Sequence, residues 1–193
     1  GVNASVSNLL FIYLTRNDVY NTGLTAPFGH AVLFGAGNTV TNSVIALNHV
    51  HNTGASSGGI QVGRGSHTNW IAENRVHTIG QFFSGYWPCM LLDRSHTGAY
   101  DPSKRNLVER NVIGPDCSDN GLQLESGRHI VRDNLIVGTI GNKAVDMSHN
   151  NATNPLDYVE FVHNTIFNRQ GYGVGLIGWD GLNGSTGLIF ANN

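Results

Sequence analysis

Three acidic residues, Asp93, Glu125 and Asp146, occupy related positions in short strand-like triplets that lie far apart in the sequence. Asp93 and Glu125 each follow such a triplet directly, and Asp146 lies in the middle of one. Hydrolysis of a glycosidic bond requires one carboxyl group as an acid and another as a base or nucleophile. If the triplets stack side by side, these three residues become the candidate catalytic residues of a glycoside hydrolase.

The expected spacing of these acids suits that chemistry. On neighbouring strands about 4.8 Å apart, the carboxyl groups of Asp93 and Glu125 would stand about 5 Å apart, as in retaining glycosidases. Asp93 and Asp146 would be two strands apart, which is nearer the separation of inverting enzymes. Repulsion between adjacent acids would raise the pKa of one of them and keep it protonated for acid catalysis.

Polar and aromatic side chains that could bind a sugar lie near these acids. Aromatic faces beside a polar groove are typical of sugar-binding clefts. The predicted substrate-binding residues are Gln61, Arg64, Arg94, Gln123, His149, Tyr86 and Trp87. The aromatic segment 82–87 could instead cover the apolar core beside its own loop, and this alternative stays open.

Three other interpretations of the same residues also stay open. Asp93 and Glu125 could pair with Arg94 and Arg64 on a solvated face, with little gain in stability. A polysaccharide lyase, which breaks the bond by β-elimination, would need a basic residue such as Arg64, Arg94 or Lys143. A non-enzymatic glycan-binding or structural protein, such as an adhesin, stalk or fibre segment, would need no catalytic residue.

A sequence repeat indicates the elements that would bring these residues together. In each copy an apolar residue is followed after two spacers by Asn, and after one more spacer by an aliphatic residue. The six copies are Leu14–Asn17–Val19, Ile45–Asn48–Val50, Ile71–Asn74–Val76, Val108–Asn111–Ile113, Val131–Asn134–Ile136 and Phe161–Asn164–Ile166. A seventh copy begins at Ile189 and ends at Asn192. The intervals between copies are irregular, as in a solenoid whose rungs keep their strands and vary their loops.

A second segment of alternating apolar character accompanies the repeat, which is typical of a short strand with one buried face. Its copies are Val32-Leu33-Phe34, Ile60-Gln61-Val62, Met90-Leu91-Leu92, Leu122-Gln123-Leu124, Val145-Asp146-Met147 and Val174-Gly175-Leu176. Parallel strands need long crossovers, and a β-helix supplies them as the other sides of each coil. We therefore predict an all-β chain, a right-handed parallel β-helix solenoid of about seven rungs, as a single domain over residues 1–193.

The repeated asparagines are expected to be structural rather than catalytic. Asn tolerates the left-handed backbone conformation of a tight corner, and stacked Asn side chains can hydrogen-bond along the solenoid as a ladder. The residues concerned are Asn48, Asn74, Asn111, Asn134 and Asn164.

A second group of outward side chains comes from the repeat itself. His49 and His51 are expected to lie beside Arg75 and His77, with Asp18 on the preceding rung. Three imidazoles could bind Zn²⁺ or another transition metal. However, Arg75 would oppose a cation, and no Glu or Cys completes a ligand set. We expect surface histidines that stack in the ladder, no metal site and no cofactor.

The segments VIALNHVHNTGASSGGIQVG and NWIAENRVHTIG resemble secreted bacterial β-helix-repeat proteins of the pectate-lyase-like superfamily. The resemblance covers nearly the whole chain. It implies the fold, a polysaccharide or oligosaccharide partner, and a secreted or cell-surface location. It carries over no catalytic set, because the Asp-Asp, Gly-His-Gly and Arg-Ile-Lys motifs of the polygalacturonase type are missing.

Composition argues against two classes of partner. The net charge is −2, only 12% of residues are charged, and no basic stretch offers a nucleic-acid footprint. No apolar run is long enough to span a membrane. Cys89 and Cys117 fall on adjacent rungs, where a disulfide is one option. Neither end offers a polar cap, so we expect a segment of a longer chain or end-to-end self-association.

Overall fold

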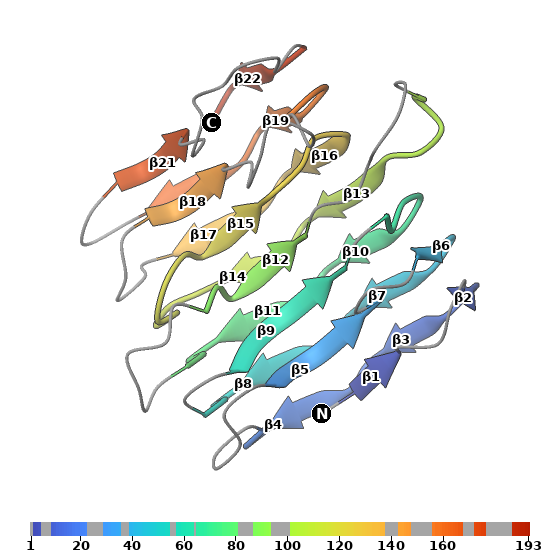
Figure 1. The fold of residues 1–193 in the computed structure, drawn as a ribbon. Helices are drawn as coiled ribbons and strands as arrows, with labels where there is room; N and C mark the ends of the chain where they lie inside the picture. The colour runs from blue at the N-terminus through green and yellow to red at the C-terminus, as the bar shows by residue number, and fades with distance from the viewer. Residues whose placement is uncertain are drawn as a thin grey trace.

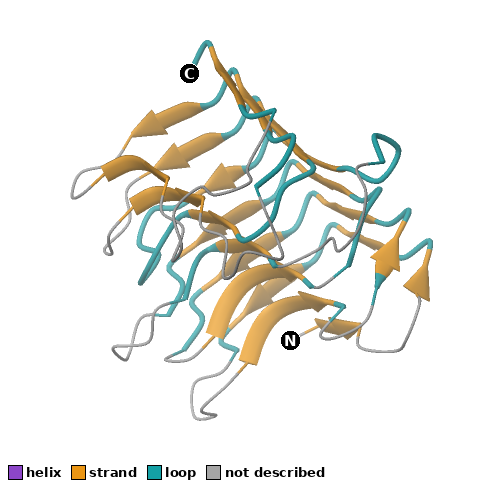
Figure 2. Ribbon diagram, turned by 45° about the horizontal axis from the view of Figure 1, so that its top comes forward, coloured by secondary structure: helices purple, strands orange, loops and turns teal. Residues whose placement is uncertain are grey.

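The computed structural model describes residues 2–4, 9–22, 29–35, 39–54, 57–63, 65–80, 87–93, 101–137, 143–147, 156–167, 172–176 and 187–193. Their strands stack in parallel along one axis, with the two ends of the chain at opposite ends of the stack (Figure 1). Each rung of chain lies on the one before (Figure 2), and the elements of the described residues are all strands. The predicted all-β parallel solenoid is confirmed. No helix in the described part of the chain is long and apolar enough to cross a membrane.

Three parallel sheets run the length of the stack, numbered here in the order in which the first rung visits them. Sheet 1 consists of β1 (Val2–Ala4), β5 (Gly29–Phe34), β9 (Ser57–Val62), β12 (Met90–Leu92), β15 (Leu122–Leu124), β18 (Lys143–Met147) and β21 (Tyr172–Leu176). Sheet 2 consists of β3 (Tyr13–Thr15), β7 (Val44–Ala46), β10 (Trp70–Ala72), β13 (Asn106–Glu109), β16 (His129–Arg132), β19 (Glu160–Val162) and β22 (Ile189–Ala191). Sheet 3 consists of β4 (Asp18–Tyr20), β8 (His49–His51), β11 (Arg75–His77), β14 (Val112–Ile113), β17 (Leu135–Val137) and β20 (Thr165–Phe167). A short pair, β2 (Leu9–Leu10) and β6 (Val40–Thr41), joins the first two rungs.

Each strand pairs with the strand at the same position of the next rung. Six successive rungs contribute to all three sheets, and a seventh adds β21 and β22. The prediction of about seven rungs is therefore confirmed. The residues between the strands supply the crossovers that parallel pairing requires.

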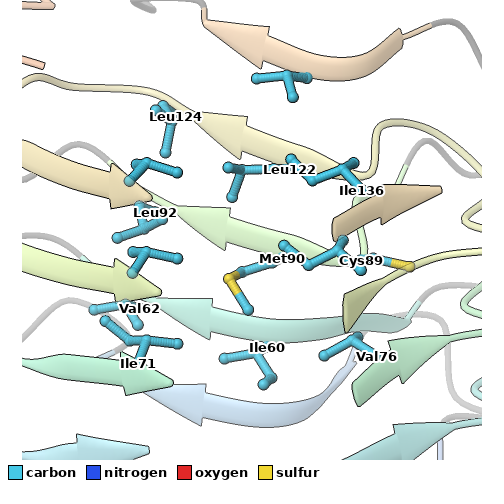
Figure 3. Packing of buried hydrophobic residues seen from close by; sticks show 14 of the residues in the cluster. Ile60, Val62, Ile71, Val76, Cys89, Met90, Leu92, Leu122, Leu124 and Ile136 are labelled. Atoms are coloured by element: carbon cyan, nitrogen blue, oxygen red, sulfur yellow. The ribbon is translucent and has the colours of Figure 1, made fainter. Parts of the chain in front are cut away.

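The core lies between the sheets and is built from columns of aliphatic side chains. One column of sheet 1 contains Ile60, Met90 and Leu122, and the next contains Val62, Leu92 and Leu124 (Figure 3). All six side chains are at most 2% exposed. Burial of such a side chain contributes about 1.5–3 kcal/mol. A slip of one residue would turn these columns outward, so the burial specifies the register of the whole sheet.

The predicted asparagine ladder is present at the corner between sheets 2 and 3. Asn48 shows the pattern, because its backbone N–H and its Nδ2 both donate to Asn74 Oδ1, at 3.0 and 2.9 Å. Its Nδ2 also donates to the carbonyl of Leu14 on the preceding rung, at 2.9 Å. The members are Asn17, Asn48, Asn74, Asn111, Asn134, Asn164 and Asn193. The ladder thus satisfies backbone groups that the corner would otherwise leave unpaired.

Two details of this corner differ from expectation. The left-handed residue is the one before each asparagine, as at Leu47 (φ 59°) and Glu73 (φ 55°), so the corner turns there and the asparagine projects its amide into the ladder. The seventh copy also lies one residue later than predicted. Phe190 pairs with Phe161, and Asn193 rather than Asn192 bonds to Asn164, because Phe190 and not Ile189 takes the column position.

A second, shorter ladder precedes sheet 2 and was not predicted. The N–H of Ser43 donates to Asn69 Oδ1 at 3.0 Å, and the N–H of Asn69 donates to Asn106 Oδ1 at 3.1 Å. Ser43 takes the position that asparagine occupies on the next two rungs, so these residues do not form a recognisable repeat in the sequence. Cys89 and Cys117, both fully buried, form a disulfide between adjacent rungs with a Cα–Cα distance of 5.4 Å.

Candidate functional site

The outer face of sheet 1 has the register that the triplets predict. Its central column is formed, rung by rung, by Leu33, Gln61, Leu91, Gln123, Asp146 and Gly175. The next residue along the strands is also aligned, since the N–H of Asp93 donates to the carbonyl of Val62 and that of Glu125 to the carbonyl of Leu92, both at 2.9 Å. Asp93 and Glu125 thus belong to neighbouring rungs, and Asp146 belongs to the rung that follows Glu125.

Glu125 and Asp146 are linked by side-chain amides on β15 and the turn before it. Asn120 Nδ2 lies 3.4 Å from Asp146 Oδ2 and 3.3 Å from Gln123 Oε1. Gln123 Nε2 in turn donates to Glu125 Oε1 at 3.0 Å. The same Asn120 nitrogen donates to Asp119 Oδ2 at 2.9 Å, so two carboxylates share one amide. We call Asp119, Asn120, Gln123, Glu125, Lys143 and Asp146 the upper cluster.

A buried cation completes the upper cluster. Lys143 Nζ lies 3.0 Å from Asp146 Oδ1, and the two side chains are only 9% and 10% exposed. The aliphatic stem of Lys143 crosses Gly175 on the next rung, where a Cβ would collide with Lys143 Cδ. Glycine at this position therefore leaves the space that lets Lys143 reach its carboxylate.

The environment of Asp119 raises the pKa of its carboxyl group above the ordinary value. Burial is the largest cause and raises the pKa of Asp119, and the negative charge of Asp146 raises it further. The charge of Lys143 and the hydrogen bond from the backbone of Asn120 lower the pKa but do not offset these two effects. A carboxyl group whose pKa is raised beside a second carboxyl group is a common setting for a catalytic acid.

A lower cluster on the preceding rungs contains His30, Gln61, Trp87 and Asp93. Gln61 Nε2 donates to Asp93 Oδ2 at 3.3 Å, and the ring of His30 meets Trp87 edge-on with 5.0 Å between centroids. Burial lowers the pKa of His30 to about 4, against the opposing effect of the Asp93 charge. The imidazole is therefore neutral over most of the pH range in which proteins function.

Three buried polar atoms of the two clusters lack a partner among the described residues. Gln61 Oε1, Asn120 Oδ1 and His30 Nδ1 are buried and have no hydrogen-bond partner among the residues that the structure describes. Buried polar atoms are normally paired, so these three are exceptions to the usual pattern.

The predicted site residues have different outcomes. Asp93, Glu125, Asp146, Gln61 and Gln123 lie on one face, in two hydrogen-bonded groups. Trp87 is half-buried against His30, next to the lower cluster. The remaining predicted residues lie outside the described part of the chain, namely Arg64, Tyr86, Arg94 and His149.

Sequence reasoning missed Asp119, Asn120 and His30. Asp119 and Asn120 belong to the turn before β15, and no periodic pattern marks a turn residue. His30 lies in the long strand β5, two residues before its triplet. No repeat in the sequence singles out any of the three.

The chain matches no protein-family model, no curated protein and no solved structure. A function for it must therefore be argued from its own residues, because fold alone does not determine chemistry.

Proposed function

We propose that this chain is a carbohydrate-active enzyme that hydrolyses a polysaccharide lying along the outer face of sheet 1. The observation that carries the proposal is the pairing of Asp119 with Asp146, which share the Asn120 amide at 2.9 and 3.4 Å while the pKa of Asp119 is raised. Glycosidases use two carboxyl groups in this manner, one protonated and one ionised.

In the proposed reaction, Asp119 donates its proton to the glycosidic oxygen as the bond between that oxygen and the anomeric carbon breaks. The carboxylate of Asp146 stabilises the positive charge that develops on the sugar. Water supplies the hydroxyl of the new reducing end and the proton that restores Asp119. Glu125, joined to Asp146 through Gln123 and Asn120, is the third candidate acid of this centre.

The rest of the face supports binding of an extended chain. The lower cluster adds polar atoms and the aromatic ring of Trp87 on neighbouring rungs, a combination that suits sugars. The stacked parallel sheets agree with the resemblance to pectate-lyase-like proteins. The Cys89–Cys117 disulfide supports a secreted or cell-surface location, because disulfides persist in oxidising compartments.

The test is the release of reducing ends from a panel of plant and algal polysaccharides. Wild type is expected to release them, and Asp119→Asn and Asp146→Asn are expected to lower kcat by about 10²- to 10⁴-fold. Asp101→Asn is the matched control, because Asp101 is a surface carboxylate that bonds only to the nearby Ser103 and Lys104 in the described structure. Activity should also fall as the pH rises through the pKa of Asp119, because its proton is then lost.

Each other result has a distinct meaning. If Asp93→Asn and Glu125→Gln abolish activity while Asp119→Asn retains it, the catalytic pair is Asp93 and Glu125. If all four variants keep full activity, the site is wrong. Unsaturated ends, detected by ultraviolet absorbance, would indicate a lyase that uses a base such as Lys143. Glycan binding without any cleavage would indicate a non-enzymatic solenoid.

A further inference from the structure

The outer face of sheet 3 carries a compact group of imidazoles that the proposed hydrolase does not use. Asp18, His49 and Arg75 form one column over three rungs, and Tyr20, His51 and His77 form the next. The rings of His49 and His51 stack with centroids 4.1 Å apart, and the ring of His51 stacks on His77 at 5.5 Å. Three histidines and one carboxylate thus gather on the first three rungs.

A single carboxylate oxygen faces two of the imidazoles. Asp18 Oδ1 lies 3.0 Å from His51 Nε2 and 3.4 Å from His49 Nδ1. Metal–ligand bonds of about 2.0–2.1 Å in a tetrahedral site place two ligand atoms about 3.3 Å apart. The two observed distances bracket that value, and one ligand atom from each of the three residues lies within 4.8 Å of the others.

We propose that Asp18, His49 and His51 form a binding site for one divalent transition-metal ion such as Zn²⁺. Imidazole nitrogen and carboxylate oxygen are ligands that such ions prefer, and three protein ligands leave a further position for water. The side chains of Asp18, His49 and His51 are 59%, 40% and 16% exposed, so an ion can reach them from solvent.

The contacts of His49 allow it to change from hydrogen-bond donor to metal ligand. His49 Nε2 lies 2.9 Å from His77 Nε2, and His77 Nδ1 lies 2.8 Å from Thr78 Oγ1. In one tautomer arrangement, Thr78 Oγ1 donates to His77 Nδ1 and His77 Nε2 donates to His49 Nε2, which leaves the proton of His49 on Nδ1, 3.4 Å from Asp18 Oδ1. With metal at His49 Nδ1, each proton moves to the other nitrogen of its ring, and the donors reverse as far as Thr78. His77 is then the outer partner that orients a ligating histidine.

Arg75 is the charge that opposes this site. Its strand position is aligned with that of His49 on the neighbouring rung. Burial is the largest cause that lowers the pKa of His49 and of His77, and the Arg75 charge lowers both further. Asp18 supplies the negative charge that offsets it, and neutral imidazoles are the ligand form. Removal of the Arg75 charge should therefore strengthen metal binding, whereas a purely structural histidine stack would give no such effect.

The test is titration of the full chain, freed of any histidine affinity tag, with Zn²⁺ and with Co²⁺. Isothermal titration calorimetry is expected to show one Zn²⁺ per chain, and Co²⁺ is expected to give visible absorption bands of a low-symmetry site. Asp18→Asn and His51→Gln should each weaken Zn²⁺ binding by more than tenfold. His77→Gln should weaken it by about 10- to 100-fold through its outer contact. Arg75→Gln should strengthen binding several-fold.

The matched control is His163→Gln, because His163 is another surface histidine near an aspartate, with Nδ1 3.9 Å from Asp133 Oδ1. This variant should bind Zn²⁺ as wild type does. Circular dichroism of each metal-free variant establishes that it is folded. Wild type that binds no stoichiometric Zn²⁺, or an Asp18→Asn/His51→Gln double variant that binds it with unchanged affinity, would overturn the proposal.

Discussion

Lys143 and Asp146 form an ion pair on the outer face of sheet 1, with 3.0 Å between Nζ and Oδ1 and about nine-tenths of each side chain buried. Removing two charges from water costs several kcal/mol for each, and their attraction only partly offsets this cost. Such a pair contributes little to the stability of a solenoid, but it fixes the positions of two charges. Those charges act on the neighbouring Asp119, and Asn120 contacts the Asp146 carboxylate.

The first prediction concerns the loss of the cation. Lys143→Met should lower the free energy of unfolding by about 3–5 kcal/mol, because Asp146 then stays buried without a counter-ion. The double variant Lys143→Met/Asp146→Asn should recover most of this loss. Urea unfolding followed by circular dichroism measures both.

The exposed pair of Lys104 and Asp101, with 3.5 Å between Nζ and Oδ2, is the control for this prediction. Lys104→Met should leave the free energy of unfolding nearly unchanged, because exposed ion pairs contribute little. A Lys143→Met effect as small as that of Lys104→Met would contradict the buried-pair account.

The second prediction concerns the pH dependence of stability. The pKa of His30 is lowered from 6.5 to about 4, so the folded state favours the neutral ring. Between pH 6.5 and about 4 the imidazole of His30 takes up a proton in the unfolded state but not in the folded state. The free energy of unfolding therefore has its full His30 contribution above pH 6.5 and loses it as the pH falls towards 4. Wild type should lose at most about 3 kcal/mol from this group over that window.

His30→Phe isolates the effect, because Phe keeps a ring against Trp87 and does not titrate. The stability difference between wild type and His30→Phe should shift against wild type on acidification. Nuclear magnetic resonance gives a direct check, since a His30 ring signal that titrates near 6.5 would contradict the burial argument.

The fold was predictable because its core has a strict pattern. Ile60, Met90 and Leu122 recur at the inner face of successive rungs, and a displaced register would bury Gln61 and Gln123 instead. The same constraint made the neighbouring positions of Asp93 and Glu125 predictable. Periodicity can place a residue on a rung whenever its strand has one buried face.

The upper cluster could not be predicted in full, because it depends on turns and burial. Asp119 and Asn120 precede β15 in a segment whose length differs between rungs, so no repeat aligns them. Lys143 carries a charge yet is buried, since Gly175 leaves room for its stem. Hydrophobic patterning assigns a lysine to the surface and gives no indication of such a pairing.

The third prediction concerns the disulfide between adjacent rungs. Cys89→Ala/Cys117→Ala should lower the free energy of unfolding by about 3–4 kcal/mol, because the closed loop restricts the unfolded chain. The two cysteines are 28 residues apart. A reducing agent should lower the Tm of wild type and leave the Tm of the double variant unchanged. Equal Tm values for reduced and oxidised wild type would contradict this expectation.

The last prediction compares two rungs of the asparagine ladder. Asn111 Nδ2 donates to the carbonyls of Ile71 and Glu109 and to Asn134 Oδ1, while its Oδ1 accepts from both nitrogens of Asn74. All of these groups are buried, and each one left unpaired costs about 1–3 kcal/mol. Asn111→Ala should therefore cost more than about 3 kcal/mol in urea unfolding.

Asn17 lies on the first rung of the same ladder and is only half-buried. Its Nδ2 donates to Asn48 Oδ1 and to the carbonyl of Thr15. After substitution, water can donate to both of these acceptors in its place. Asn17→Ala should thus cost only about 1 kcal/mol. Equal losses for Asn17→Ala and Asn111→Ala would mean that asparagine acts through the local turn alone. A much larger loss at Asn111 would mean that the ladder stabilises the solenoid by satisfying buried backbone groups from rung to rung.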